Sequence, residues 1–437
     1  MSTSLDETTM EGVKGPSSVE GPTEQAGIPH RPLSHDPDST IAVTCEDVNA
    51  PFDLNVGEKK WSLLYTALDQ HGYILRERYR PGWVGSWVGK WWKRASKCED
   101  SIGISHGLMV IDARRKSDGK QVLLKLWCHG FQDIKELPVL RLFSEPPHSS
   151  DPRNHCISLL DTLDLTESLH EEIRLAVDPR PLQRAASIFS RVLVEPLLRD
   201  WRSPDFVMVA EGLQFMMQCL EGLEFMHSNN VAHGDIHSGN ILMDASQLFP
   251  DGFHGPRNLN PRHQLSERRL RRLTRVQAPV KYYFIDFGSS CMFSGFEERT
   301  LVRTTATAIR PPELRKGGDG TEYDPFKADI YALGFTLLEY FMLRPGIWFI
   351  LPILRDMIAE KPEERPTAQE IRQRFQEAVS ELPRSTLRRH LGWTWATVGP
   401  REYMQEGAEY IRVLWHSYRY GLPKEITEAC RSKSVMK

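Results

Sequence analysis

The stretch VAHGDIHSGNILMD, at 231–244, constrains the fold and the chemistry of this chain more than any other segment. It places Asp235 two residues after His233 and Asn240 five residues after Asp235, then runs into an apolar pair that predicts a buried strand. Phosphoryl transfer needs a carboxylate that orients the attacking hydroxyl and an amide oxygen that holds Mg²⁺ on the phosphates. We therefore interpret Asp235 as a candidate catalytic residue and Asn240 as a candidate metal ligand.

The loop resembles the HRDLxxxN signature of protein kinases. Gly234 stands where that signature has arginine, and His237 stands where many serine/threonine kinases have lysine. The HGD order with a following histidine is also similar to the aminoglycoside and choline phosphotransferase relatives of kinases. Motifs elsewhere in the chain are needed to distinguish a protein kinase from a small-molecule phosphotransferase.

Composition narrows the class of protein. The 437 residues allow two or three domains, or one large two-lobed domain with extensions. A net charge of -3 gives no reason to expect a nucleic-acid partner. The seven cysteines are odd in number and scattered, so neither a disulfide framework nor a zinc site is indicated. The polar N-terminus lacks a secretory pattern, and we expect an intracellular protein, cytoplasmic or nuclear.

Hydropathy predicts no membrane span, because the most apolar segment, 333–354, is interrupted by charged residues and prolines and should form buried helices. The expected organisation has four parts: a disordered tail at 1–55, an N-lobe with a tryptophan-rich N-terminal extension at 56–195, a C-lobe at 196–383 and a helical extension at 384–437. Aromatics among basic residues at 61–92 could stack nucleic-acid bases. We favour a packed, partly exposed subdomain instead.

A hairpin is predicted from strands at 109–114 and 121–127 around an Asp-Gly turn. Lys125 lies inside the second strand, where a lysine is costly unless it has a partner or a ligand. It matches the strand lysine of kinases, which holds the α and β phosphates of ATP. Glu136 is the candidate partner of this lysine; the alternative is an ordinary surface glutamate. Pro138 is compatible with a helix here only within its first turn.

Strands at 154–165 and 191–198 resemble those that lead to the kinase hinge, and a polar insertion at about 166–185 separates them. The resemblance implies that Glu195, Leu197 and their neighbours offer backbone groups to adenine. A GxGxxG phosphate loop should precede the hairpin, yet only Gly103 and Gly107 occupy that region. They form either a degenerate phosphate loop or an ordinary turn.

The second half of the chain is better marked. A long buried helix is predicted at 206–227 from the helical spacing of its apolar residues. Asp286 begins a DFG sequence after a predicted strand, and the resemblance implies that it is the second Mg²⁺ ligand. Glu313, Asp329 and Arg365 resemble the APE glutamate, the aspartate that supports the catalytic loop, and the arginine that pairs with this glutamate. Together they imply an activation segment, which small-molecule kinases typically lack.

Two departures from the kinase pattern lie in the catalytic loop. Gly234 removes the arginine that would bind a phosphorylated activation segment, so activity should not require phosphorylation. The candidate phosphorylation sites are Thr300, Thr304, Thr305 and Thr307. His237, a third candidate catalytic residue beside Asp235 and Lys125, would support the transferring phosphoryl group less than a lysine does.

The sequence therefore predicts an α+β, two-lobed protein kinase-like fold with a small β-rich N-lobe and a large, mostly helical C-lobe. It is most similar to kinase-like proteins of filamentous and mushroom-forming fungi. We expect an ATP- and Mg²⁺-dependent serine/threonine kinase with a protein substrate; the alternatives are a pseudokinase scaffold and a small-molecule phosphotransferase. Partners could bind the C-terminal extension or a basic insertion at about 247–280. Its arginines are Arg268, Arg269, Arg271, Arg272 and Arg275.

Overall fold

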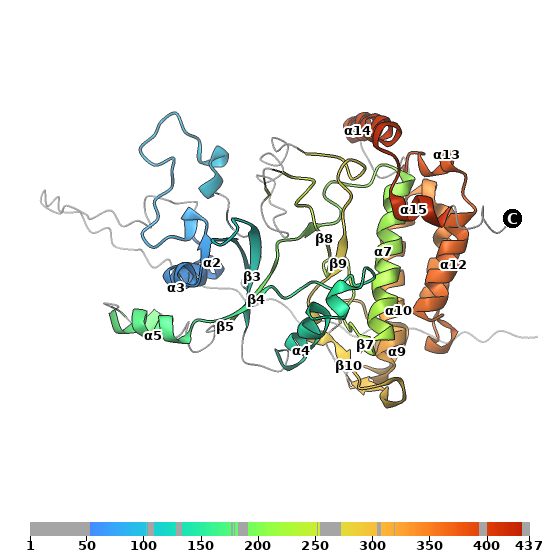
Figure 1. Ribbon diagram of the computed structural model, residues 1–437, viewed down its shortest axis with the longest axis horizontal. Coiled ribbons are helices and arrows are strands. Elements are labelled where there is room, and N and C mark those ends of the chain that lie inside the picture. Colours follow the sequence, from blue (N-terminus) through green and yellow to red (C-terminus); the bar gives the residue numbers. More distant parts are fainter. Residues whose placement is uncertain are drawn as a thin grey trace, which may run out of the picture. The chain divides into compact units, whose positions relative to one another are not determined.

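The computed structural model describes most of the chain after the expected N-terminal tail (Figure 1). The described residues are 53–101, 103, 109–127, 133–175, 178, 180–181, 191–250, 252–253, 272–303, 307–318, 320–392 and 400–430. They form an α+β fold with two lobes, as predicted: one built on a five-stranded sheet, the other mostly helical.

The small lobe is an antiparallel sheet with the strand order β1-β2-β3-β5-β4. Its strands are β1 Tyr73–Leu75, β2 Val110–Arg115, β3 Gln121–Trp127, β4 Asp161–Asp164 and β5 Arg191–Pro196. The predicted hairpin is confirmed as β2 and β3, and Gly119 takes the positive φ of 69° that the turn requires. Leu124 and its neighbours on one face of the sheet pack with α2 Val56–Leu63 and α3 Tyr65–Gln70.

The tryptophan-rich segment extends across the first strand of the sheet, with Trp61 in α2 before β1 and Trp83 after β1. Strand β1 precedes Trp83 and pairs with β2, so 76–109 connects two neighbouring strands. A buried ion pair between Arg78 and Glu58 anchors the start of this connection. Trp61 is fully buried whereas Trp91 is 92% exposed, which agrees with a subdomain that is partly packed and partly exposed.

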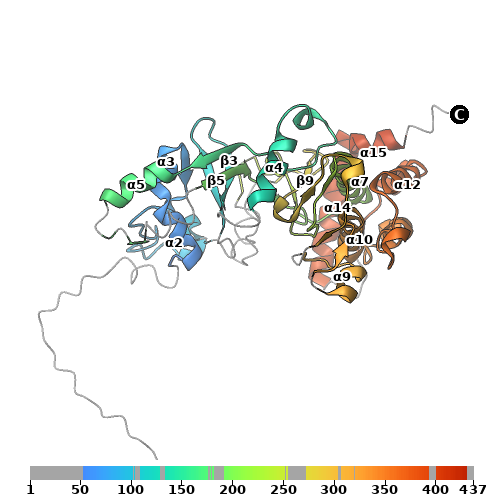
Figure 2. The same cartoon turned by 90° about the horizontal axis from the view of Figure 1, so that it is seen from below.

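Helix α4 Asp133–Ser144 disagrees with the expectation for Pro138. The proline is the sixth residue of the helix, beyond the first turn, so the carbonyl one turn earlier lacks its helical N–H donor. Buried side chains of α4 such as Leu140 and Phe143 keep the helix packed against the large lobe, where Phe143 contacts Phe225. Figure 2 shows α4 between the strands β3 and β5 of the small lobe and the large lobe. Tertiary packing thus outweighs the local cost of the proline.

The expected strand at 154–165 is shorter than predicted. Only β4 is paired within the sheet, while Cys156 forms an isolated bridge with Phe284 of the large lobe. Part of the polar insertion that follows is helical, as α5 Thr166–Leu175. The stretch from Cys156 to β4 therefore joins the two lobes.

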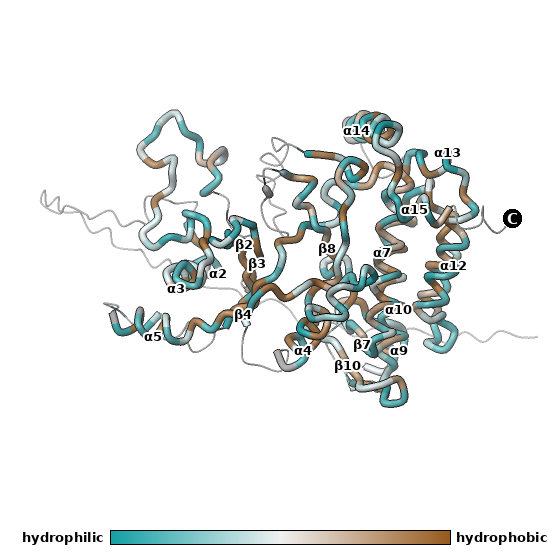
Figure 3. The backbone as a smooth tube through the Cα atoms, viewed as in Figure 1, coloured by the Kyte–Doolittle hydropathy of each residue, from teal (hydrophilic) through white to brown (hydrophobic). Residues whose placement is uncertain are grey.

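The large lobe is organised around α7 Val209–Ser228, the predicted long helix, which is buried along most of its length. Figure 3 shows hydrophobic residues along β3 and along α7. The other helices are α9 Pro312–Gly317, α10 Pro325–Phe341, α11 Leu351–Met357, α12 Ala368–Ser380, α13 Arg384–Leu387, α14 Pro400–Tyr420 and α15 Lys424–Ala429. The described part of the large lobe also contains short strands: β6 Arg199–Asp200, β7 Val231–Ala232, β8 Ile241–Met243, β9 Tyr282–Phe284, β10 Cys291–Met292, β11 Val302–Arg303 and β12 Glu322–Tyr323. No helix among the described residues is long and apolar enough to cross a membrane.

The end of the basic insertion is not a solvated face. Arg275 is 2% exposed and donates hydrogen bonds to three backbone carbonyls, among them that of Trp201. Arg272 pairs with Glu409 of α14 at 2.8 Å. The other three arginines of the insertion lie outside the described residues. The insertion therefore ends in structural contacts with the large lobe and with the C-terminal extension.

Candidate active site

Lys125 lies between two carboxylates from different lobes. Its Nζ donates to Glu136 Oε1 on α4 at 2.6 Å and to Asp286 Oδ1, after β9, at 3.0 Å. Glu136 is therefore the partner of this lysine and not a surface residue. Burial lowers the pKa of Lys125, but the nearby carboxylates of Glu136, Asp286 and Glu195 outweigh it, so the pKa is raised and the ammonium stays charged.

The backbone turns sharply at Asp286. Its φ of 66° lies in the left-handed region, which aspartate tolerates better than most residues, and a short 3-10 turn, η5 Phe287–Ser289, follows. Phe287 is fully buried against Phe143 of α4 and His233. This packing holds α4 against the loop and leaves the Asp286 side chain 43% exposed beside Lys125.

Asp329 of α10 holds the loop after β7 by hydrogen bonds, as the sequence predicted. The two oxygens of this buried carboxylate accept hydrogen bonds from the backbone N–H groups of His233, at 2.7 Å, and Gly234, at 2.9 Å. His227 Nε2 lies 3.1 Å from the same carboxylate. Asp329 thus fixes the loop through its backbone, independently of the loop's own side chains.

The His233 side chain ties the loop to the strand before Asp286. Its Nε2 lies 3.0 Å from the carbonyl oxygen of Ile285, and its Nδ1 accepts from the backbone N–H of Asp235 at 3.3 Å. This pattern assigns the proton to Nε2. Burial lowers the pKa of His233, which favours the same neutral form. His233 therefore sets the distance between the Asp235 and Asp286 segments.

Gly234 is required by its surroundings. Its φ is +80°, and a Cβ there would lie 2.3 Å from the carbonyl oxygen of Ser289. No side chain fits this position without moving the backbone. The absence of an arginine before Asp235 is therefore built into the local geometry of the loop.

Asp235 and Asn240 are brought together as predicted. The Asn240 amide nitrogen donates to the Asp235 backbone oxygen at 3.0 Å and approaches its carboxylate at 3.4 Å. The amide oxygen remains available as a metal ligand. The backbone N–H of Ala308, in the segment between Asp286 and Glu313, donates to Asp235 Oδ1 at 2.7 Å, and no sequence pattern predicts this contact.

His237 borders the carboxylate of Asp235. Its Nδ1 accepts from the backbone N–H of Gly239 at 3.1 Å, which directs Nε2 toward Asp235 Oδ2, 3.8 Å away. The imidazole is 29% exposed. It can therefore offer an N–H donor close to the Asp235 carboxylate.

Glu195 and Leu197 lie where β5 leaves the sheet, and Glu195 adds a feature that the sequence analysis missed. The hinge interpretation concerned its backbone, whereas its side chain lies on the same sheet face as Lys125. Burial raises the pKa of this carboxyl to about 7. Leu197 is 6% exposed and belongs to the core of the large lobe.

The structure does not bring Gly103 to this site. A Cβ on Gly103 would lie 2.9 Å from Glu58 Oε1, so this glycine borders the buried Arg78–Glu58 pair. Gly107 lies outside the described residues. Gly103, the one predicted phosphate-loop glycine that the structure describes, therefore does not support the phosphate-loop interpretation.

The segment from Asp286 to Glu313 is anchored at its far end by a buried ion pair. Arg365 donates to both oxygens of Glu313, at 2.7 and 2.6 Å, and its own side chain is fully buried. The predicted pair is therefore present in the bidentate form. Arg299, another unforeseen contact, donates to Asn230 and to the carbonyl of His227.

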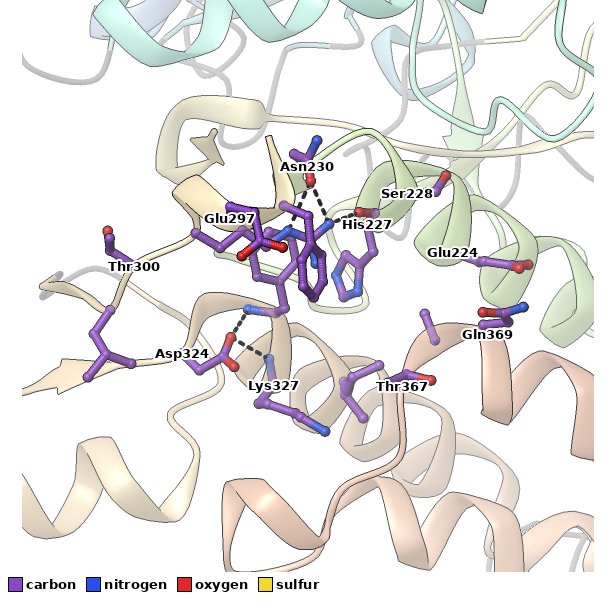
Figure 4. A pocket seen from close by; sticks show the side chains of 16 residues that line it. Glu224, His227, Ser228, Asn230, Glu297, Thr300, Asp324, Lys327, Thr367 and Gln369 are labelled. Carbon is purple, nitrogen blue, oxygen red and sulfur yellow. Dashed lines mark hydrogen bonds between the residues drawn. The ribbon is translucent and has the colours of Figure 1, made fainter. Parts of the chain in front are cut away.

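A cavity of about 860 Å³ opens beside this segment. Figure 4 shows Glu297 and Thr300 on one side of it and Thr367 and Gln369 on the opposite side. Asp324 lies in its wall and caps α10. The cavity contains none of the candidate catalytic residues and is separate from the Lys125 site.

Two comparisons with known proteins find similarity to protein kinases. A family model described as "Protein kinase domain" matches residues 195–348. The serine/threonine-protein kinase dst4 of Dictyostelium discoideum is 28% identical over 150 residues, which are 33% of this chain and 23% of that protein. Over residues 195–348 the chain is therefore similar to members of the protein kinase-like superfamily. It spans less than a quarter of this relative's length. Lys125 and Glu136 precede the matched region, so the structure alone places them beside Asp286.

Proposed function

We propose that this kinase-like chain is an active, ATP- and Mg²⁺-dependent protein kinase that phosphorylates serine or threonine. The observation that carries the proposal is the double contact of Lys125 with Glu136 and Asp286. Kinases need both the lysine–glutamate pair and the aspartate in place before transfer. A lysine held in this way presents its charge to the phosphates of a bound nucleotide.

The remaining residues have complementary roles in this proposal. Asp235 orients the substrate hydroxyl and accepts its proton, and His237 donates a hydrogen bond nearby. Asp286 and Asn240 would hold Mg²⁺, which neutralises charge on the phosphates when bound. Their oxygen donors fit this ion. Among the described residues no group of three or more His, Cys, Asp or Glu could hold a metal, so phosphate and water oxygens would complete its coordination.

A protein substrate is favoured by the anchored segment between Asp286 and Glu313, since small-molecule kinases typically lack it. Serine/threonine direction is supported by the name of the similar Dictyostelium kinase. The catalytic loop also lacks the arginine-containing pattern of tyrosine kinases.

The test is Mg²⁺-ATP binding and phosphate transfer to a peptide library by the wild-type protein, Asp235→Ala and Asp286→Asn. We expect Asp286→Asn to weaken Mg²⁺-dependent nucleotide binding and Asp235→Ala to abolish transfer while binding persists. Absence of nucleotide binding by the wild type would reject the proposal that the protein is an ATP-dependent enzyme. Transfer to small metabolites alone would select a small-molecule phosphotransferase.

A second function, that of a scaffold, is favoured by the exposed face of α14. Apolar side chains there recur at helical spacing and are more than half exposed: Met404, Ile411, Trp415 and Tyr418. Arg388 and Arg419 lie over the rings of Tyr418 and Trp415, so an amphipathic helix with acidic flanks is the fitting partner. Loss of a binding partner in Ile411→Glu, with phosphate transfer unchanged, would support it; an unchanged set of partners would reject it.

A further inference from the structure

The Glu195 side chain is a buried polar group whose hydrogen bonding is incomplete in the described part of the chain. It is 3% exposed, and its Oε1 has no hydrogen-bond partner among the described residues. Burying a carboxyl without a hydrogen bond is costly, and the few buried polar groups of native proteins that lack partners often belong to functional sites. Glu195 therefore calls for an explanation beyond packing.

Glu211, a second buried glutamate, shows what a structural carboxyl looks like in this protein. It is 2% exposed, and its Oε2 accepts hydrogen bonds from the backbone N–H groups of Val207 and Met208 at the start of α7. Glu195 has similar burial, but no backbone N–H group of the described residues donates to it. The two residues differ in hydrogen bonding and not in exposure.

The position of Glu195 on the sheet points to the nucleotide site. It pairs with Leu123 of β3, while Lys125 pairs with Leu193 of β5. Because side chains alternate along a strand, Leu123, Lys125, Leu193 and Glu195 share one face. Leu123 and Lys125 are two residues apart along β3, which corresponds to a distance of about 7 Å along the strand. A nucleotide whose phosphates contact Lys125 could reach Glu195 with its base.

The charges around Glu195 also belong to this site. The groups that act on its carboxyl are Lys125 on β3, Glu136 on α4 and Asp286 after β9. Lys125 already donates to Glu136 and Asp286. Glu195 is thus the third carboxyl around Lys125, and no ion pair joins the two in the described structure.

We propose that the Glu195 carboxyl group reads the purine base of the bound nucleotide by accepting a hydrogen bond from a 6-amino group and disfavouring a 6-oxo group. An ionised carboxylate can only accept hydrogen bonds, so a carbonyl oxygen facing it would leave two acceptors opposed. A binding site built around such a group discriminates strongly against a ligand that leaves it unpaired. The inference rests on the proposed nucleotide binding and adds a specificity-determining residue to it.

The experiment compares the affinities of Mg²⁺-ATP and Mg²⁺-ITP, in which an oxo group replaces the 6-amino group. Calorimetry at about pH 8 keeps the Glu195 carboxyl ionised, since burial raises its pKa to about 7. The wild type should bind ATP more tightly than ITP. In Glu195→Leu this preference should fall about tenfold or more, the size expected for a hydrogen bond to a charged group. Glu195→Gln should still bind ATP and should bind ITP more tightly than the wild type does, because an amide can both donate and accept hydrogen bonds.

Glu211→Gln is the matched control, because it alters a buried carboxyl outside the site and should keep the wild-type ratio. An unchanged ATP-to-ITP ratio in both Glu195 variants would overturn the inference while leaving the proposed function intact. Failure of the folded wild type to bind either nucleotide would overturn both. The free energy of unfolding of each variant shows whether it is folded.

Discussion

At the scale of single residues, Gly234 is the clearest case of geometry that dictates sequence. Gly234→Ala should destabilise the protein by about 2 to 4 kcal/mol, because it combines positive φ with a clash against the Ser289 carbonyl. Gly295→Ala is the control, since a Cβ there meets nothing within 4 Å. Urea unfolding gives both values. Equal stabilities of the two variants would show that the loop relaxes around a side chain.

Glu195 should leave a signature in the pH dependence of stability. Burial raises its pKa from 4.5 to about 7, so its ionisation disfavours the folded state. The free energy of unfolding should therefore fall as pH rises from about 4.5 to about 7 and then stay lower. Glu195→Gln removes this loss. Its stability relative to the wild type should increase over the same window by up to about 3 kcal/mol in denaturant titrations. A difference that does not vary with pH would contradict the assignment.

At the scale of elements, α9 and the start of α12 are joined by the Arg365–Glu313 pair. Arg365 also donates to the carbonyls of Ala359 and Lys327, so Arg365→Ala should cost about 3 to 5 kcal/mol. Glu313→Ala should cost less, because its carboxylate is partly exposed. A double-mutant cycle should give a coupling free energy of about 0.5 to 3 kcal/mol. Additive losses would show that the two residues act separately.

The elements also show what sequence patterns can and cannot predict. The β2–β3 hairpin and α7 follow from local periodicity and turn chemistry, so they were predictable. The topology around the tryptophan-rich segment was not, because β1 has only three residues and finds its partner far along the chain. The rule that proline is compatible with a helix only in its first turn fails at Pro138, because buried contacts of α4 hold the helix together.

The same distinction holds for the candidate site. Asp235, Asn240 and Asp286 are carried by short motifs whose spacing alone indicates their chemistry. The side-chain direction of Glu195 depends on strand register, because a shift of one residue would turn it to the other face. The burial of Arg275 depends on carbonyls more than 70 residues away, and no local pattern reveals such contacts.

At the scale of the whole molecule, backbone and side-chain contacts hold the segment from Asp286 to Glu313 in place. Ala308 binds Asp235, Arg299 binds the end of α7, and Gly234 leaves no room for a phosphate-binding arginine. Treatment with a phosphatase should therefore leave the rate of peptide phosphorylation nearly unchanged. The measurement is the initial rate before and after treatment, with complete removal of phosphate checked by mass spectrometry. A large loss of activity would mean that a phosphorylated threonine organises this segment.

The central claim is that Asp235, in a site assembled by Lys125, Glu136 and Asp286, serves phosphoryl transfer. The most direct test is the rate of transfer from Mg²⁺-ATP to peptide by the wild type and by Asp235→Asn, with nucleotide affinity measured on the same samples. We predict transfer by the wild type and a loss of about 10²- to 10⁴-fold in the variant at unchanged ATP affinity. A wild type that binds ATP without transferring phosphate, or a variant as fast as the wild type, would contradict the account.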